Sequence, residues 1–426
     1  MVGEARLTPY GDFSADFVEA RLADICDSED GVQTGPFGSQ LHKEDYVLVG
    51  TPIITVEHLG ENRILHEDIP LVSDEDKQRL HKYTLRKGDI VFSRVGSVDR
   101  RALVTGAEDG WLFSGRCLRV RPNPGRINPS YLSYFFGLPS FKEHIRAIAV
   151  GATMPSLNTE ILSNILIPHP RELTEQQAIA CILGALDDKI ELNRRMNETL
   201  EQIAQAIFKS WFVDAVKDGL PEGWREVSIL DFADLLSGGT PKTEVPEYWD
   251  GDIPWVSAKD VTKAQNSFVL STERQITKAG VENSATKVLP AVTTVVSARG
   301  TVGNHCLLGR EMAMNQTNYG LRAKDNRSHY FVFFNVSHLV EELRQQAYGT
   351  IFDTITTRTF QHTKIVRPPD LLIQRFEAIA SSMMTKVLIN LQESETLTAL
   401  RDALLPKLIS GKVRVPDAER IIARCA

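Results

Sequence analysis

Two short loops contain the residue types best suited to binding a phosphate or the edge of a base. Residues 93–97 read Ser-Arg-Val-Gly-Ser and residues 297–301 read Ser-Ala-Arg-Gly-Thr, and both follow a β-branched run. Hydroxyls can bond phosphate oxygens, arginine offers a fork that matches guanine O6 and N7, and glycine lets the backbone approach closely. The residues predicted to make such contacts are Ser93, Arg94, Gly96, Ser97, Ser297, Arg299, Gly300 and Thr301. Alternatively, both segments are only tight turns with exposed charges.

Other polar residues near these loops could also contact a nucleic acid. Cations neutralise backbone phosphates, and the residues predicted to do so are Lys43, Arg100, Arg101 and Lys259. Side-chain amides can pair with adenine, and the residues of this type are Asn304, Asn315, Gln316 and Asn318. The alternative for each is a solvated loop position, since polar loop residues usually face water.

The local charge supports a polyanionic partner better than the overall charge does. The chain has a formal net charge of −7, which discourages nonspecific binding to a polyanion. Residues 86–126, however, contain nine Lys and Arg against four Asp and Glu. We therefore expect a basic patch on an acidic protein.

The motifs of methyl transfer, ATP hydrolysis and metal catalysis are missing or incomplete. Residues 128–131 (Asn-Pro-Ser-Tyr) lack the second proline of an adenine methyltransferase motif, and we interpret them as a helix start with Asn128 as N-cap. The sequence has no complete phosphate loop, no H-E-x-x-H pattern and no C-x-x-C pair. Residues 238–242 (Gly-Gly-Thr-Pro-Lys) suit a phosphate cradle and a turn equally well. We expect no catalytic residue, no cofactor and no metal.

The chain contains an internal repeat with a period of about 200 residues. Residues 50–59 (GTPIITVEHL) correspond to residues 251–261 (GDIPWVSAKDV), and residues 85–98 correspond to residues 289–302. Short β-branched runs and turn residues in each copy predict mixed strands and helices. A long helical pattern follows each copy, so the predicted order is globular unit, helix, globular unit, helix.

Both long helical patterns carry an apolar seam with alternating steps of four and three residues. At the start of the first pattern, Thr174 and Gln177 would form a capping box. The first seam consists of Ile179, Leu183, Leu186, Ile190, Asn193, Asn197, Leu200, Ala204, Ile207 and Trp211. The second, displaced by 197 residues, consists of Phe376, Ala380, Met383, Val387, Asn390, Ser394, Leu397, Arg401, Leu404 and Leu408.

Each seam is polar at its centre, where Asn193 and Asn197 correspond to Asn390 and Ser394. A polar layer costs stability but fixes register and orientation. One helix cannot bury its own stripe, so we expect the two helices to pair as an antiparallel coiled coil in which the polar centres meet. In the alternative, each helix packs only on its own globular unit. A helix of roughly 38 residues is ~57 Å long, which sets the largest separation between the two globular units. On a DNA duplex this length equals about 16 base pairs at 3.4 Å each.

Size and composition agree with several folded domains. The chain has 426 residues, of which 42% are hydrophobic and 24% charged, as in ordinary globular proteins. No apolar run reaches the ~18 to 20 residues that a bilayer requires, so we expect a cytoplasmic protein without a membrane partner. The predicted fold class is α+β, with two mixed α/β domains, two long paired helices and an internal pseudo-two-fold repeat.

Four segments resemble the specificity (S) subunit of type I restriction-modification systems. They are AIFKSWFVD at residues 206–214, LPEGW at residues 220–224, GGTPKTEVPEYWDGDIPWVSAKD at residues 238–260 and ALLPKLISGKVRV at residues 403–415. The resemblance covers essentially the whole chain. It implies target-recognition domains at residues 1–170 and 218–369, with helical spacers at residues 171–217 and 370–415.

The resemblance also implies a function. A chain of this family would be a noncatalytic subunit that binds double-stranded DNA at a split site. It would direct two adenine-N6 methyltransferase subunits and restriction and translocase subunits to that site. Two other functions stay open, a self-sufficient adenine-N6 DNA methyltransferase and a coiled-coil adaptor that binds only proteins. Base-contacting residues cannot be carried over, because target-recognition domains vary greatly within the family.

Overall fold

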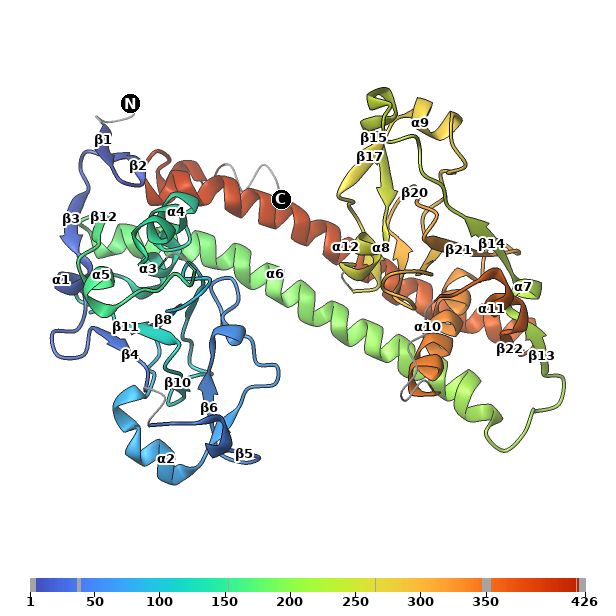
Figure 1. Cartoon of the computed structure of the whole chain (residues 1–426), viewed down its shortest axis with the longest axis horizontal. Helices are drawn as coiled ribbons and strands as arrows, with labels where there is room; N and C mark the ends of the chain where they lie inside the picture. The colour runs from blue at the N-terminus through green and yellow to red at the C-terminus, as the bar shows by residue number, and fades with distance from the viewer. Residues whose placement is uncertain are drawn as a thin grey trace. The chain divides into compact units, whose positions relative to one another are not determined.

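The chain divides into two compact units that share two long helices. The computed structural model (Figure 1) describes residues 5–36, 40–151, 153–264, 266–346, 354–418 and 420. The first unit comprises residues 1–188 and 397–426, and the second comprises residues 189–396. Helices α6 (Leu173–Phe208) and α12 (Asp370–Ile409) each contribute residues to both units. Within the described ranges, no helix has the length and apolarity needed to cross a membrane.

The first unit contains small sheets covered by short helices. A four-stranded antiparallel sheet has the order β4-β11-β8-β9, a second sheet has the order β10-β6-β7-β5, and β1-β2 and β12-β3 form separate pairs. The strands are β1 (Ala5–Thr8), β2 (Gly11–Ser14), β3 (Val18–Arg21), β4 (Val32–Thr34), β5 (Tyr46–Val47), β6 (Thr51–Ile54), β7 (Leu71–Val72), β8 (Ile90–Ser93), β9 (Arg101–Leu103), β10 (Leu112–Phe113), β11 (Cys117–Val120) and β12 (Leu166–His169). The helices are α1 (Leu22–Ile25), α2 (Asp74–Arg79), α3 (Pro129–Phe135), α4 (Pro139–Ile148) and α5 (Thr159–Ser163), with 3-10 turns η1 (Lys43–Asp45), η2 (Val56–His58) and η3 (His81–Tyr83).

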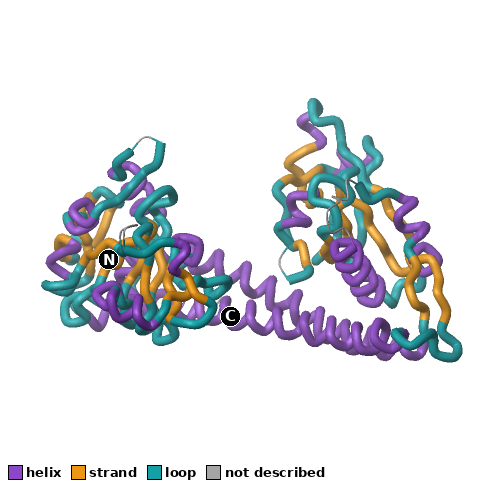
Figure 2. The backbone as a smooth tube through the Cα atoms, turned by 60° about the horizontal axis from the view of Figure 1, so that its bottom comes forward, coloured by secondary structure: helices purple, strands orange, loops and turns teal. Residues whose placement is uncertain are grey.

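The second unit also combines small sheets with short helices, and Figure 2 distinguishes its strands from its helices. Its main sheet has the order β14-β21-β18-β19-β16, beside the sheet β17-β15-β20 and the pair β13-β22. The strands are β13 (Arg225–Ser228), β14 (Ala233–Ser237), β15 (Trp249–Val256), β16 (Phe268–Val269), β17 (Arg274–Ile276), β18 (Thr294–Ser297), β19 (His305–Leu308), β20 (Ala313–Met314), β21 (Asn318–Ala323) and β22 (Lys364–Arg367). The helices are α7 (Ile229–Phe232), α8 (Ala258–Thr262), α9 (Lys278–Glu282), α10 (His329–Gln346) and α11 (Thr357–His362), with a π-helical turn η4 (Lys209–Val213) and 3-10 turns η5 (Asp214–Val216) and η6 (Pro246–Tyr248).

Strand register confirms the internal repeat. Strand β8 pairs antiparallel with β11, which places Ser93 opposite Cys117, and β18 pairs antiparallel with β21, which places Ser297 opposite Asn318. The parallel pair β6-β10 likewise corresponds to the parallel pair β15-β20. The two predicted contact loops therefore follow equivalent strands.

In each unit an aromatic helix packs on the long helices. The core of the first unit joins Tyr131 and Phe135 of α3 to Leu183 of α6 and to Leu404 and Leu408 of α12. In the second unit, Phe331 and Phe334 of α10 pack in one core with Phe208 of α6 and with Phe376 and Ala380 of α12. In the first unit the N-terminal part of α6 thus packs against the C-terminal part of α12. In the second unit the C-terminal part of α6 packs against the N-terminal part of α12. The two helices therefore pair antiparallel, as predicted.

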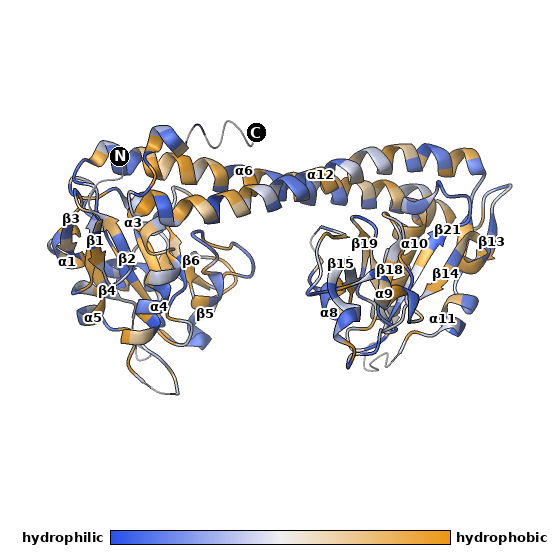
Figure 3. Ribbon diagram, turned by 90° about the horizontal axis from the view of Figure 1, so that it is seen from above, coloured by the Kyte–Doolittle hydropathy of each residue, from blue (hydrophilic) through white to orange (hydrophobic). Residues whose placement is uncertain are grey.

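The seam departs from the prediction in its details. Ile179, Leu183 and Leu186 are buried, but Ile190, Leu200 and Ile207 are only half-buried. In α12 the fully buried methionine is Met384, and the predicted Met383 is half-buried. Heptad counting misplaces this position because the aromatic side chains of α10 also pack on α12, so its buried stripe is wider than a two-helix seam. Figure 3 shows hydrophobic and hydrophilic residues distributed along both helices.

The polar centres of the two seams meet inside the second unit. Asn193 donates from Nδ2 to Glu393 Oε2 at 2.8 Å and to Ser394 Oγ at 3.2 Å. Asn390 donates from Nδ2 to Asn197 Oδ1 at 2.8 Å. All three asparagines are at most 1% exposed. Because a buried amide is costly unless it is bonded, these bonds select one register of α6 against α12.

Helix α6 begins differently from the prediction. It starts at Leu173, so Thr174 lies inside the first turn and is not the N-cap. The side chain of Gln177 does not cap α6 either, because its Oε1 accepts a hydrogen bond from Asn128 Nδ2 at 2.5 Å. A contact with α3, which the local pattern could not reveal, replaces the predicted capping box.

Candidate nucleic-acid interface

The two predicted loops have the same backbone framework. In the first unit, Ser93 N donates to Arg100 O at 2.9 Å and Ser93 Oγ donates to Val95 O at 3.3 Å. Gly96 has a φ of 78°. A Cβ at Gly96 would meet nothing within 4 Å, so glycine is needed here for the left-handed backbone and not for space.

The loop of the second unit repeats each of these features. Ser297 N donates to Asn304 O at 2.8 Å, and Ser297 Oγ donates to Arg299 O at 3.2 Å. Gly300 has a φ of 81° and also faces open space. When the glycines are superposed, Ser97 corresponds to Thr301 and Arg100 to Asn304.

By this equivalence, the two predicted contact arginines, Arg94 and Arg299, occupy different positions in their loops. Arg94 corresponds to Ala298, since their amides donate to Arg116 O and Thr317 O respectively, each at 2.8 Å. Arg94 is half-buried and donates from Nη1 to Gly115 O at 3.2 Å. Arg299 corresponds to Val95 and is exposed. The two loops thus present unlike side chains on one framework.

The serines that begin the loops do not lie where a phosphate could reach them. Ser93 and Ser297 are both 0% exposed, and each hydroxyl is bonded within its own loop. They shape the turns, which corrects the prediction that they contact a ligand. The hydroxyl residues of the loops that remain exposed are Ser97 and Thr301.

The predicted basic patch of the first unit is partly internal. Arg101 is 2% exposed and is bound to Ser133 O at 2.9 Å and to Glu61 Oε1 at 2.6 Å. Arg119 and Arg121 are 0% and 6% exposed, and both form ion pairs with Asp30. Arg101 is therefore not a surface phosphate contact, because its charge is used to hold the domain together.

Asp89 completes this buried charge network. Its two carboxylate oxygens accept bonds from Arg121 Nε at 2.8 Å and Arg121 Nη2 at 2.7 Å. A sequence count of charges cannot separate such pairs from surface cations. Of the other predicted cations, Lys43 is exposed on η1, and Arg100 is half-buried with its guanidinium bonded to Leu59 O.

In the second unit the predicted polar residues are linked through helix α8. Asn304 Nδ2 donates to Thr262 Oγ1 at 3.0 Å, and the hydroxyls of Thr262 and Thr301 are 2.9 Å apart. Lys259 forms an ion pair with Glu273 at 2.5 Å. These contacts place the loop at residues 297–301 beside α8.

The remaining amides are engaged in different ways. Gln316 is exposed and bonded to Thr240 Oγ1. Asn318 is 1% exposed and donates to Val256 O at 3.1 Å. Asn315 accepts from the backbone and hydroxyl of Thr317 at 3.1 and 2.7 Å. Asn318 is therefore internal, contrary to the prediction.

Packing explains the glycines at residues 238–242. A Cβ at Gly238 would lie 2.0 Å from Asn315 O, and one at Gly239 would lie 2.4 Å from Thr286 N. Gly239 O also accepts the indole N–H of Trp255 at 3.0 Å. The segment is a tightly packed turn, which favours that alternative over a phosphate cradle.

The structure also explains the methyltransferase-like tetrapeptide as a helix start. Asn128 Oδ1 accepts a bond from Tyr131 N at 2.9 Å, and Pro129 is the first residue of α3. Tyr131 is 0% exposed. Because a buried ring cannot stack on a flipped base, the motif provides no binding place for adenine.

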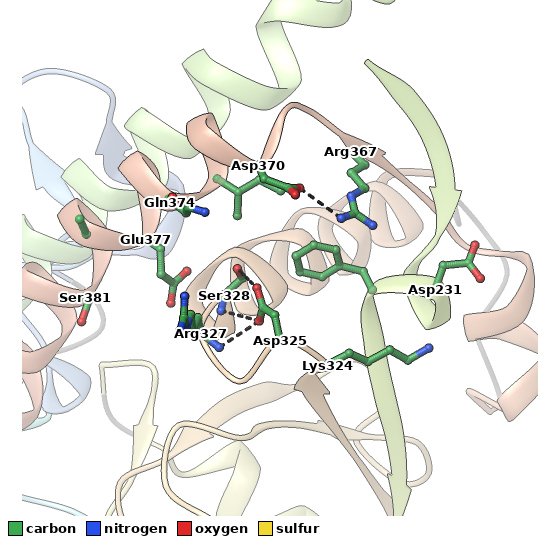
Figure 4. Close-up of a pocket in the computed structure, with 13 residues that line it drawn as sticks. Asp231, Lys324, Asp325, Arg327, Ser328, Arg367, Asp370, Gln374, Glu377 and Ser381 are labelled. Carbon is green, nitrogen blue, oxygen red and sulfur yellow. Dashed lines mark hydrogen bonds and ion pairs between the residues drawn. The ribbon is translucent and has the colours of Figure 1, made fainter. Parts of the chain in front are cut away.

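A pocket of about 610 Å³ lies in the second unit, between α7, residues 324–328 that precede α10, and the start of α12 (Figure 4). It is lined by Asp231, Phe232, Lys324, Asp325, Arg327, Ser328, Arg367, Asp370, Ile373, Gln374, Glu377, Ala378 and Ser381. Glu377 of α12 accepts hydrogen bonds from Tyr330 N and Phe331 N, both at 3.0 Å. A carboxylate of the chain therefore already occupies the N-terminus of α10, where an external anion would otherwise bind.

Glu377 is expected to make the stability of the second unit depend on pH. Burial raises the pKa of Glu377 from 4.5 to about 7, against the lowering effect of its backbone N–H donors. Because the folded state holds the proton more tightly, this stabilisation is present below about pH 4.5 and is lost as the pH rises through about 7. The loss is at most about 3 kcal/mol, since the side chain is partly exposed.

Chemical denaturation at pH 5 and pH 8, followed by tryptophan fluorescence, would measure this effect, since four of the five tryptophans lie in the second unit. Glu377→Gln should reduce the difference between the two pH values. Glu395→Gln, at an exposed position of the same helix, should leave it unchanged. Equal pH dependence in wild type and Glu377→Gln would contradict the expectation.

Arg274 is an exposed arginine that the sequence pattern did not identify as a candidate contact. Arg274 begins β17 opposite Trp255, and its guanidinium carbon lies 3.5 Å from the centre of the Trp249 ring. No local pattern links these residues, because the contact depends on the register of β15 against β17. The pairing became visible only in the folded chain.

Comparison with known proteins places this architecture in one family. A family model described as "Type I restriction modification DNA specificity domain" matches residues 15–202 and 221–395. The HindI specificity subunit of Haemophilus influenzae is 26% identical, with coverage of 83% of this chain and 92% of the relative. The MjaIX specificity subunit of Methanocaldococcus jannaschii is also 26% identical, with coverage of 70% and 72%.

A solved structure has the same fold. It is the S subunit of a type I restriction-modification system from M. genitalium, with a TM-score of 0.62 at 17% identity and coverage of 92% of this chain and 96% of that one. Together with the repeated units and the shared long helices, the family match over both repeats settles the classification. The chain belongs to the type I restriction-modification DNA specificity family.

Proposed function

We propose that this chain is the DNA sequence-recognition subunit of a type I restriction-modification complex. Each unit reads one half of a split, asymmetric duplex target. Residues 1–170 and 218–369 act as target-recognition domains, and residues 171–217 and 370–415 act as helical spacers. The subunit is noncatalytic and acts in the cytoplasm, while methyltransferase subunits and restriction and translocase subunits carry out the chemistry on the DNA.

The observation that carries this proposal is one loop framework with two sets of side chains. The loops at residues 93–97 and 297–301 share their backbone hydrogen bonds and a glycine with positive φ. A common framework supports a common mode of approach to the duplex. Unlike residues at matched positions, such as Val95 against Arg299, support readout of unlike half-sites.

The DNA contacts proposed for the two units are the residues that stay accessible on these surfaces. In the first unit they are Lys43, Arg94, Gly96, Ser97 and Arg100, and in the second Lys259, Arg299, Gly300, Thr301, Asn304 and Gln316. Cations that meet phosphates supply the salt-dependent share of affinity, whereas side chains that meet base edges supply the selectivity.

Methylome sequencing of a host that expresses the chain with its cognate methyltransferase subunits would test this function. The expected result is adenine-N6 methylation at one split motif with two unlike halves. Arg299→Ala should relax selectivity at one or two positions of a single half-site by about 5- to 150-fold, the range for a lost bidentate base contact. Arg310→Ala is the matched control, because Arg310 is also exposed but follows the far end of β19.

Two outcomes would favour the other functions. Methyl transfer to DNA by the chain alone would identify a self-sufficient methyltransferase. Unchanged sequence-selective binding after combined replacement of Arg94 and Arg299 by alanine would favour a protein adaptor without DNA readout.

A further inference from the structure

An arginine of the second unit is held flat on a rigid aromatic platform. The rings of Trp249 and Trp255 pack edge to face, with their centres 5.2 Å apart. Both are nearly buried, at 6% and 7% exposure, and their indole N–H groups donate to Lys242 O at 3.1 Å and Gly239 O at 3.0 Å. Arg274 stacks on Trp249 at 3.5 Å and lies 6.0 Å from Trp255. The platform therefore limits the motion of the guanidinium.

This guanidinium is poised for an external partner. Arg274 is exposed, and within the described part of the chain no carboxylate forms an ion pair with it. Its neighbour Glu273 pairs instead with Lys259, at 2.5 Å. A guanidinium that stacks through its face keeps its N–H edges available, so it can still make two parallel hydrogen bonds.

Arg274 is connected to the candidate interface through helix α8. Asp260 Oδ1 of α8 accepts a hydrogen bond from Glu273 N at 3.0 Å. Two residues further along α8, the hydroxyl of Thr262 is 2.9 Å from that of Thr301. Two residues of helix rise ~3 Å, about one base-pair step of 3.4 Å. Arg274 and the loop at residues 297–301 therefore suit neighbouring base pairs of one short half-site.

The first unit has no arginine at the equivalent place. Ile53 pairs with Leu112 in the way that Trp255 pairs with Ala313, so Ile53 is the counterpart of Trp255. The residue opposite Ile53 is Pro70, whose carbonyl accepts the amide of Ile53 at 2.9 Å. A contact made by Arg274 would therefore belong to one half-site only.

We propose that Arg274 is a specificity-determining residue of the second unit and that it reads a guanine through O6 and N7. This inference rests on the proposed DNA-recognition function. A phosphate can be bound by a mobile lysine as well, whereas a planar donor pair in a preset orientation matches the fixed acceptor pair of guanine in the major groove. The Trp249 platform supplies that orientation before DNA binds.

The test uses the complete methyltransferase complex and compares wild type with Arg274→Ala, Arg274→Lys and Arg274→Gln. Methylome sequencing and competition binding would use duplexes altered at one position at a time. All three variants should lose discrimination for one guanine in the second unit's half-site by about 5- to 150-fold. The other half-site should keep its sequence, and Arg310→Ala should change neither half.

Each outcome is informative. Arg274→Gln keeps a planar group on Trp249, so the thermal midpoint of this variant should match that of wild type. Equal midpoints would show that a loss of selectivity comes from lost base readout and not from impaired folding. Equal weakening on all sequences with a shallower salt dependence would identify a phosphate contact and overturn the proposal, as would selectivity unchanged in every variant. If wild type shows no split motif at all, the proposed function itself fails. A wild-type motif that Arg274→Gln leaves intact rejects only the role of Arg274.

Discussion

Removal of one heptad from each long helix is expected to shorten the unread spacer of the DNA target by about three base pairs, with both half-sites unchanged. A heptad of helix rises ~10.5 Å, and a base-pair step rises ~3.4 Å. Suitable segments are residues 186–192 of α6 and residues 395–401 of α12, because the boundaries between the units fall at residues 188 and 396. Methylation of the original motif should be lost almost completely.

The paired deletion keeps the polar layer intact. Asn193 and Asn197 remain in phase with Asn390 and Ser394, because both helices lose the same number of residues. Deletion from α6 alone is the control, since it displaces the buried amides from their partners and should impair folding without creating a new motif. Methylome sequencing of the double deletion reads the spacing directly. Retention of the original spacing would show that the helices do not determine it.

Asp89→Ala is expected to destabilise the first unit by about 3 to 5 kcal/mol, the usual cost of removing one partner from a buried ion pair. Asp89 has a side-chain exposure of 2% and accepts two hydrogen bonds from Arg121. Its carboxylate also accepts the amide of Arg86 at 2.8 Å. Without Asp89, the buried positive charge of Arg121 is balanced, among the described residues, only by its bonds to Asp30 and to the carbonyl of Thr84.

Hydrogen–deuterium exchange of strands β8 and β11, with and without denaturant, would localise this loss to the first unit. Asp109→Ala is the matched control, because Asp109 is exposed and accepts a single amide bond, from Lys87 at 2.9 Å. The control should change stability by less than about 0.5 kcal/mol. A loss for Asp89→Ala as small as that of the control would mean that Arg121 finds another partner or reaches water.

The local residue pattern was enough to predict the architecture. The seams at Leu183 and Leu404, and the asparagines at their centre, follow from a periodicity that any amphipathic helix shows along its sequence. Duplication of the pattern after about 197 residues indicated two similar units and an antiparallel pairing. The turn positions of Gly96 and Gly300 were likewise predicted, whereas their positive φ, which few other residues adopt without strain, was observed only in the structure.

The local residue pattern could not predict which side chains are buried or which partners they bind. Arg101, Arg119 and Arg121 were counted as surface charge, yet all three are buried against carboxylates. Composition records how many charges a segment has, whereas burial depends on residues far away in the chain, such as Asp30 for Arg121. The same reason explains Met384 in place of Met383, since the width of the buried stripe depends on α10.

The sequence alone thus determined two repeated α/β units, two amphipathic helices with matching polar centres and a pair of glycine-containing loops, because each of these depends on near neighbours along the chain. Tertiary structure decided which polar side chains remain available to a ligand. It buried Ser93, Ser297 and Arg101 and placed Arg274 on Trp249. Strand register and domain packing bring residues together across long stretches of chain, and no local spacing encodes the distance between them.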